Sequence, residues 1–397
     1  MKADHLYICK FPQTHWKRPA VLSDAPGFDH SLVNIYPRNN TFDYMATETL
    51  HIGRNISKIR TARGMRQEAL AAEPGISAGA WIRLSATTII SLFVLFGFGQ
   101  SKVEKDSLKV NEAALKVTLL GTGDPQPTIE RFGPSILVQA GGQNLLFDAG
   151  RGCLQRLRQI KVSYNKIDAL FLTHLHSDHI VGLPDLWLTG WLLTQRTMPL
   201  KVFGPTGLDT MMMYLQKAFA FDIKMRVEDD KAAPDGNKFL VTEIQQGIIY
   251  EKNGVKVIAI EVDHGIVRPA FGYRIEYRGH SVVLSGDTKY CENLIKFAKG
   301  TDLLVHEVVI APETLSQSDP AYHVFAHHTT PEQAAEVFNK VQPKVAAYSH
   351  IVFLHGMDEK ELLKRTNYQG TLVIGEDLMS FSIDETVVVS HWNNKDK

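Results

Sequence analysis

Hydrophobic and polar positions alternate in a regular way from residue 116 to the end of the chain. Short apolar runs, among them 117–121, 135–139 and 144–148, are separated by turn residues, which is the pattern of buried strands. Stretches with helical spacing and further apolar runs then follow one another. We therefore expect one α/β domain over 116–397, a size that a single domain can reach.

The pattern changes upstream of residue 116, where three segments can be separated. Residues 1–45 have no helical or strand period and are rich in aromatic, Pro and Asn residues, so we expect an irregular segment. Residues 46–78 have helical spacing, and residues 79–115 hold an apolar segment followed by a charged and polar linker. The expected domain is therefore preceded by an irregular and helical extension.

The helical segment 46–78 places Ile52, Ile56 and Ile59 at helical spacing before a glycine stops the pattern. It resembles the opening of a phage-repressor-type helix-turn-helix. In that family a recognition helix with polar residues for base edges should follow Ser77. Here the chain continues into Ala-Gly-Ala-Trp and an apolar stretch. The motif is therefore truncated, and we do not expect this segment to bind DNA.

Residues 84–98 are nearly all apolar and follow Arg83, as in the hydrophobic region of a secretory signal. The segment is shorter than the roughly 20 apolar residues that a full membrane span needs. If it acts as a signal, the protein is exported to the periplasm or tethered to a membrane. If it is a buried helix instead, the protein is cytoplasmic, and the sequence leaves both alternatives open.

The overall charge is balanced, with 43 Lys and Arg residues against 43 Asp and Glu residues among 397. A balanced chain is not expected to have the binding of a long polyanion as its main task, and the sequence contains no strong nucleic-acid patch. The three cysteines, Cys9, Cys153 and Cys291, form no Cys-x-x-Cys zinc pattern and imply no disulfide framework. The chemistry must therefore come from other side chains.

The densest group of metal-binding side chains is the run His174-Leu-His176-Ser-Asp178-His179, which directly follows the apolar run 169–172. A strand that ends in this run brings several ligand atoms to one point. Imidazole nitrogen and carboxylate oxygen are ligands of zinc and similar divalent cations. One short loop cannot easily surround a single ion with all four groups, so we expect two metal ions.

Two metal ions need more ligands, and the sequence offers three more at the ends of apolar runs. His264 and Asp287 follow two runs with the pattern of strands, and His350 follows a third. Loops at strand ends converge in sheet-based folds, so these side chains can meet the first group. The three runs cover residues 255–262, 281–285 and 344–349.

The order of these residues resembles that of the metallo-β-lactamase superfamily, in particular the branch of tRNase Z and the arylsulfatase-like and phosphodiesterase proteins. The resemblance covers about residues 116–382. It implies a four-layer αββα sandwich of two mixed sheets, with helices outside and metals at one edge, and it allows a homodimer. The shorter matching motifs are Gly121-Thr-Gly, Phe147-Asp-Ala-Gly, Val202-Phe-Gly-Pro-Thr-Gly, Phe271-Gly-Tyr-Arg, Val305-His-Glu and His328-Thr-Thr.

The resemblance also implies a ligand set for two zinc ions, or for other divalent metals in the same places. Each ion would have three ligands of its own, and the carboxylate of Asp287 would bridge the pair. The ligands would be His174, His176 and His264 for the first ion and Asp178, His179 and His350 for the second. A bridging carboxylate partly neutralises two close dications, and a water between them becomes a hydroxide nucleophile near neutral pH.

Catalysis also needs a proton for the leaving oxygen. By resemblance to tRNase Z, His328 is the candidate general acid and Glu307 its orienting partner; Asp178 is placed with them as a catalytic residue as well as a ligand. The competing interpretation of His328 is a place beside a helix cap, where Thr330 would cap and Pro331 would begin the helix. The two roles are compatible, because the capping falls to Thr330.

Three functions remain open from the sequence. The first hypothesis is a dinuclear zinc hydrolase that cleaves a small phosphodiester or sulfate ester by attack of a metal-bridging hydroxide. The alternative is a tRNase Z-type endoribonuclease that processes the 3′ end of tRNA, with RNA as its partner. We rank it second because residues 265–286 have room for one hairpin and not for the extended tRNA-binding arm of long-studied bacterial tRNase Z. The weakest hypothesis is a DNA-binding regulator with a degenerate hydrolase domain.

Overall fold

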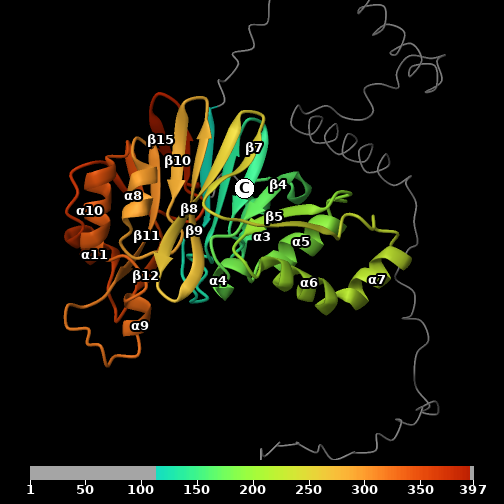
Figure 1. Ribbon diagram of the computed structural model, residues 1–397, viewed down its shortest axis with the longest axis horizontal. Helices are drawn as coiled ribbons and strands as arrows, with labels where there is room; N and C mark the ends of the chain where they lie inside the picture. Colours follow the sequence, from blue (N-terminus) through green and yellow to red (C-terminus); the bar gives the residue numbers. More distant parts are fainter. Residues whose placement is uncertain (1–112, 394–397) are drawn as a thin grey trace, which may run out of the picture. The chain divides into compact units, whose positions relative to one another are not determined.

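The computed structural model describes residues 113–393, which fold into an α/β sandwich (Figure 1). The predictions for residues 1–45, for the helix-turn-helix-like segment 46–78 and for the apolar stretch 84–98 lie outside this range. Within the described range, no helix is both long enough and apolar enough to cross a membrane.

The strands of the described range form two mixed sheets. The first sheet has the strand order β15-β14-β1-β2-β3-β4-β5-β6, and the second has the order β13-β12-β11-β10-β9-β8-β7. The first sheet consists of β1 (Leu115–Gly121), β2 (Ser135–Ala140), β3 (Gln143–Phe147), β4 (Ile167–Phe171), β5 (Leu200–Gly204), β6 (Phe239–Glu243), β14 (Ser380–Ile383) and β15 (Val387–Ser390). The second consists of β7 (Gly247–Lys252), β8 (Val255–His264), β9 (Val267–Tyr277), β10 (His280–Leu284), β11 (Leu303–Ile310), β12 (Val345–Phe353) and β13 (Leu372–Ile374).

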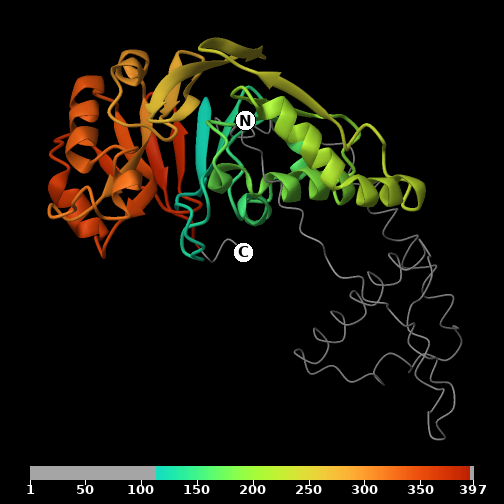
Figure 2. The same ribbon diagram turned by 60° about the horizontal axis from the view of Figure 1, so that its bottom comes forward.

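Helices cover the outer faces of both sheets (Figure 1 and Figure 2). Those associated with the first sheet are α3 (Cys153–Gln159), α4 (Ser177–Ile180), α5 (Leu183–Leu192), α6 (Leu208–Ala218) and α7 (Ala220–Glu228), with a short 3₁₀ turn at Tyr164–Lys166. Those associated with the second sheet are α8 (Glu292–Ala298), α9 (Tyr322–Phe325), α10 (Pro331–Val341) and α11 (Glu359–Arg365).

Strand β4 illustrates why the apolar runs are continuous and do not alternate with polar residues. Ala169 and Phe171 belong to the core between the two sheets, whereas Leu170 and Leu172 belong to the core between the first sheet and its helices. Both faces of the strand are therefore buried, and each position needs an apolar side chain. This layering confirms the four-layer αββα sandwich expected from the sequence.

Two local predictions are confirmed. Residues 265–286 hold the predicted hairpin of β9 and β10, which are antiparallel and joined at Arg278–Gly279. Thr330 caps α10, because its side chain accepts a hydrogen bond from the Gln333 backbone N–H, and Pro331 begins the helix.

The position of His350 differs from the sequence prediction. The apolar pattern placed it after a strand, but it lies inside β12. Its φ of 47° is left-handed, and the pairing of β11 with β12 shifts register between Tyr348 and Ile351. The ladder therefore continues beyond His350, with an irregularity at the position where its side chain leaves the sheet.

Candidate metal centre

Seven side chains singled out by the sequence lie together at one edge of the sandwich. They come from the β4–α4 segment (His174, His176, Asp178 and His179), the end of β8 (His264), the loop after β10 (Asp287) and strand β12 (His350). All of them are buried except His176, which is exposed. The structure thus brings together every ligand candidate that the sequence predicted.

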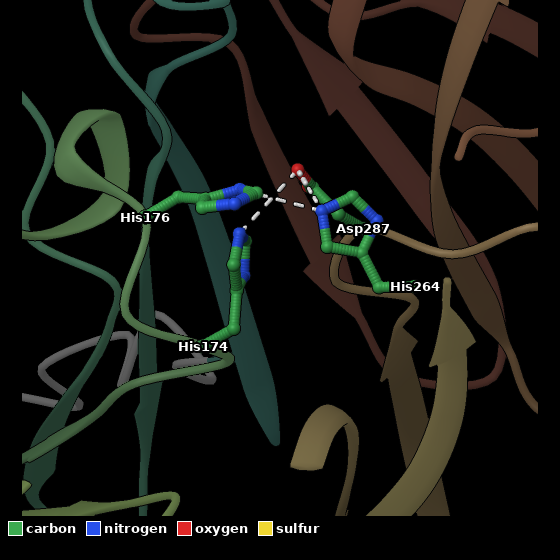
Figure 3. A group of neighbouring side chains, drawn as sticks. All are labelled: His174, His176, His264 and Asp287. Carbon is green, nitrogen blue, oxygen red and sulfur yellow. Dashed lines mark hydrogen bonds and ion pairs between the residues drawn. The ribbon is translucent and has the colours of Figure 1, made fainter. Parts of the chain in front are cut away.

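Figure 3 shows the first group, His174, His176, His264 and Asp287, with the side chains turned toward one another. The Nε2 atoms of His174 and His264 lie 3.8 and 3.9 Å from Oδ2 of Asp287. Nδ1 of His176 lies 3.4 Å from Nε2 of His264. Three imidazoles and one carboxylate oxygen therefore surround a common point.

The second group, Asp178, His179 and His350, lies beside the same carboxylate. Oδ2 of Asp178 is 3.5 Å from Nε2 of His179 and 3.3 Å from Nε2 of His350. Those two nitrogens are also 3.3 and 3.4 Å from Oδ2 of Asp287. One oxygen atom of Asp287 therefore faces both groups, as the predicted bridging role requires.

Two observations indicate that these side chains can bind metal ions. Within each group the candidate ligand atoms all lie within 4.8 Å of one another. In addition, the Nε2 atom of His174 is buried without a hydrogen-bond partner. A buried nitrogen without a partner costs free energy, and a cation between the side chains would remove that cost.

The pKa values of the histidines in the second group show that their surroundings favour positive charge. Burial disfavours the charged imidazole of His179, but the Asp287 and Asp148 carboxylates outweigh burial and raise its pKa well above the ordinary value. In the same way, burial opposes and Asp287 and Asp178 favour the charged form of His350, whose pKa rises to about 9. The carboxylates therefore favour positive charge on these two imidazoles, and bound dications would supply that charge instead.

Asp148 and Thr173 support the centre, and sequence reasoning gave them no role. Oδ2 of Asp148 lies 2.8 Å from Nδ1 of His179, and Oδ1 of Asp148 accepts a hydrogen bond from the Thr173 backbone N–H. The Thr173 hydroxyl lies 3.0 Å from Nδ1 of His174. These contacts orient the rings so that each Nε2 points into the site. The sequence feature that could have identified Asp148 is its position at the end of a strand, in the motif Phe147-Asp-Ala-Gly.

Replacing Asp148 by asparagine should weaken zinc binding about 10- to 100-fold, because His179 loses the carboxylate that orients its ring and makes it more basic. Competition with a chromophoric chelator measures the affinity. Asp168→Asn is the matched control, because Asp168 lies near the start of β4, at the end of that strand remote from His174. This variant should bind zinc as the unmodified protein does. Equal affinities for the two variants would show that Asp148 has no such role.

His328 and Glu307 lie beside the second group. Nδ1 of His328 is 3.1 Å from Oε2 of Glu307, whose Oε1 accepts a hydrogen bond from the Thr329 backbone N–H. The His328 ring stacks on that of His350, with centroids 5.4 Å apart. Burial disfavours the charged imidazole, but Glu307 outweighs burial and raises the pKa of His328. The arrangement therefore favours the protonated form of His328 next to the candidate metal centre.

Comparison with known proteins assigns the family. A family model described as a beta-lactamase superfamily domain matches residues 143–351. Ribonuclease Z of Mycolicibacterium gilvum is 39% identical over 274 residues, which are 66% of this chain and 94% of the relative. The chain belongs to the metallo-β-lactamase superfamily. Ribonuclease Z of Mycobacterium bovis is 36% identical over 271 residues, 66% of this chain and 96% of the relative.

Solved structures of the superfamily share the fold. The short form of human tRNase Z superposes with a TM-score of 0.51 at 23% identity, covering 68% of this chain and 99% of that protein. The metallo-beta-lactamase fold protein YhfI of Bacillus subtilis gives a TM-score of 0.51 at 19% identity, covering 67% and 98%. With its His and Asp clusters, the protein is a metal-dependent hydrolase of this superfamily, related to ribonuclease Z.

Proposed function

We propose that the protein is an endoribonuclease of the ribonuclease Z type that cleaves precursor tRNA on its 3′ side. The observation that carries the proposal is the 39% identity to a ribonuclease Z of which this chain spans 94%. The arrangement of the seven ligand candidates supports it, because paired divalent metals suit phosphodiester cleavage. We assign the activity to the domain proposed over 116–397.

This proposal reverses the order that the sequence suggested, in which a small phosphodiester or sulfate ester came first. The short interval 265–286 was the argument against tRNA. The match to ribonuclease Z of M. gilvum covers 94% of that relative, so only a small part of the relative lies outside the match. The short interval 265–286, which has no long arm, therefore does not set this chain apart from that ribonuclease Z.

In the proposed mechanism the two metal ions would be held by the seven ligand candidates, and when bound they supply an activated water and stabilise negative charge on the phosphate. The remaining work falls to the protein. His328, whose pKa Glu307 raises against the effect of burial, delivers a proton to the leaving ribose oxygen. Glu307 holds the His328 ring in place, and the backbone N–H groups of Thr288 and Thr329 hold Glu307.

The test is turnover of four substrates by the zinc-loaded protein: precursor tRNA with a 3′ trailer, mature tRNA, bis(p-nitrophenyl) phosphate and p-nitrophenyl sulfate. We expect one cleavage position in the precursor and a kcat/KM at least about 10³-fold above that for either small ester, equivalent to about 4 kcal/mol. His174→Ala protein from the same purification controls for a contaminating ribonuclease. Faster turnover of a small ester without site-specific tRNA cleavage would overturn the proposal.

A further inference from the structure

Three charged side chains form a cluster around the end of β8, which carries His264, and the loop after β10, which carries Asp287. They are Asp263, Arg268 and Lys289. One carboxylate pairs with both cations: Asp263 lies 3.8 Å from the Arg268 guanidinium and 3.8 Å from Nζ of Lys289. The three side chains keep 45%, 73% and 38% of their surface exposed. We call this group the Asp263 cluster.

Backbone hydrogen bonds hold the Asp263 cluster against the candidate metal centre. The Lys289 backbone N–H donates to the Asp263 carbonyl at 2.8 Å, which ties the loop carrying Asp287 to the end of β8. Nε of Arg268 donates to the Gly265 carbonyl at 3.0 Å, so the arginine folds back over the turn that follows His264. The backbone of Lys289 and the side chain of Arg268 are therefore anchored within a few residues of proposed metal ligands.

The turn between Asp263 and Arg268 lies against the site. A Cβ at Gly265 would meet the His327 ring at 2.8 Å, and the His327 carbonyl lies 3.1 Å from Nδ1 of His264. His176, in the same metal-binding group as His264, is exposed, whereas His179 and His350 in the other group are buried. The cluster is therefore next to the metal-binding group that includes an exposed ligand candidate.

The charges of the cluster do not cancel. One carboxylate cannot neutralise two cations, and exposed ion pairs at 3.8 Å contribute little to stability. Nη2 of Arg268 faces Asp263 and Nε donates to the Gly265 carbonyl, which leaves Nη1 for a phosphate oxygen. The exposed ammonium of Lys289 is a compact phosphate ligand. A net positive charge with free donors beside a hydrolytic site suits a phosphate group.

We propose that Arg268 and Lys289 bind a backbone phosphate of the RNA next to the bond that is cleaved. The inference rests on the proposed ribonuclease function and adds a substrate-binding subsite to it. Asp263 positions the two cations and weakens their electrostatic attraction for the phosphate. The subsite contributes to binding and does not take part in the chemical step.

The test compares Arg268→Gln/Lys289→Gln with a matched double variant, Lys256→Gln/Arg278→Gln. Arg278 follows the other end of β9, roughly 30 Å from Arg268 at about 3.3 Å per residue, and Lys256 lies at the far end of β8. Both variants lose two positive charges. We expect the first to raise KM for precursor tRNA about tenfold with kcat within about twofold, and to lower the salt dependence of log KM by about one. The control should change neither quantity.

Two further readouts separate the possible outcomes. Asp263→Asn should act in the opposite direction and lower KM, a result that general damage to the loop would not produce. Binding of a short fluorescent single-stranded DNA to the zinc-loaded protein tests phosphate recognition without RNA cleavage, and the cluster variant should bind it more weakly than the control. If precursor tRNA is not cleaved while this difference persists, the proposed function fails and the subsite stands. Equal binding and equal KM for the two double variants would overturn the subsite.

Discussion

Replacing Asp287 by asparagine should empty both metal positions together and lower phosphodiester hydrolysis at least about 10³-fold, equivalent to about 4 kcal/mol of transition-state stabilisation. The reason is geometric, because one oxygen of Asp287 lies 3.3 to 3.9 Å from imidazole nitrogens of both groups. None of the other six side chains places one oxygen atom within 4 Å of imidazole nitrogens of both groups. Zinc content after dialysis, by atomic emission, and kcat/KM measure the two effects.

A comparison variant makes this result specific. His176→Ala alters the first group alone and should leave the second ion in place, with close to one zinc per chain. Thermal unfolding of both variants shows whether the fold is kept. An Asp287→Asn protein that retains two zinc ions and normal turnover would contradict the bridging role.

His328→Ala should keep both metal ions and slow cleavage of precursor tRNA by about 10²- to 10⁴-fold, the usual range for loss of a general acid. The ribose oxygen is a poor leaving group and needs the proton that His328 holds against Glu307. A nitrophenolate leaves without a proton, so hydrolysis of bis(p-nitrophenyl) phosphate should slow by less than about tenfold. The ratio of the two losses is the measurement.

His323→Ala is the matched control, because His323 is an exposed histidine of the same segment. It should change neither substrate's turnover by more than about twofold. Because His328 also lies within reach of Asp287 and His350, loss of a metal ion from His328→Ala would make it a ligand. Equal slowing of both substrates would exclude it as the proton donor.

The apolar pattern was sufficient to predict one α/β domain and the residues that meet at the site, and the family resemblance supplied the four layers. Strands such as β4 are buried on both faces, so their apolar runs are long and easily recognised. Side chains at the ends of such strands converge at the edge of the sheets. His174, His264 and Asp287 could therefore be placed together before their distances were known.

Other features depend on tertiary contacts that local patterns do not contain. The register shift that places His350 inside β12 arises from pairing with β11. The support that Asp148 gives to His179 joins residues 31 positions apart. The preference between a small ester and tRNA could not come from the ligand motif, because that motif is shared across the branch that the chain resembles. Substrate choice depends on surfaces such as the Asp263 cluster.

Anomalous diffraction at the zinc edge, from crystals of the zinc-loaded protein, tests the central claim most directly. We expect two peaks roughly 3.5–4 Å apart, one beside His174, His176 and His264 and the other beside Asp178, His179 and His350, with Asp287 contacting both. A single peak, or two peaks of which either lies away from Asp287, would contradict the paired metal centre on which the proposed chemistry depends.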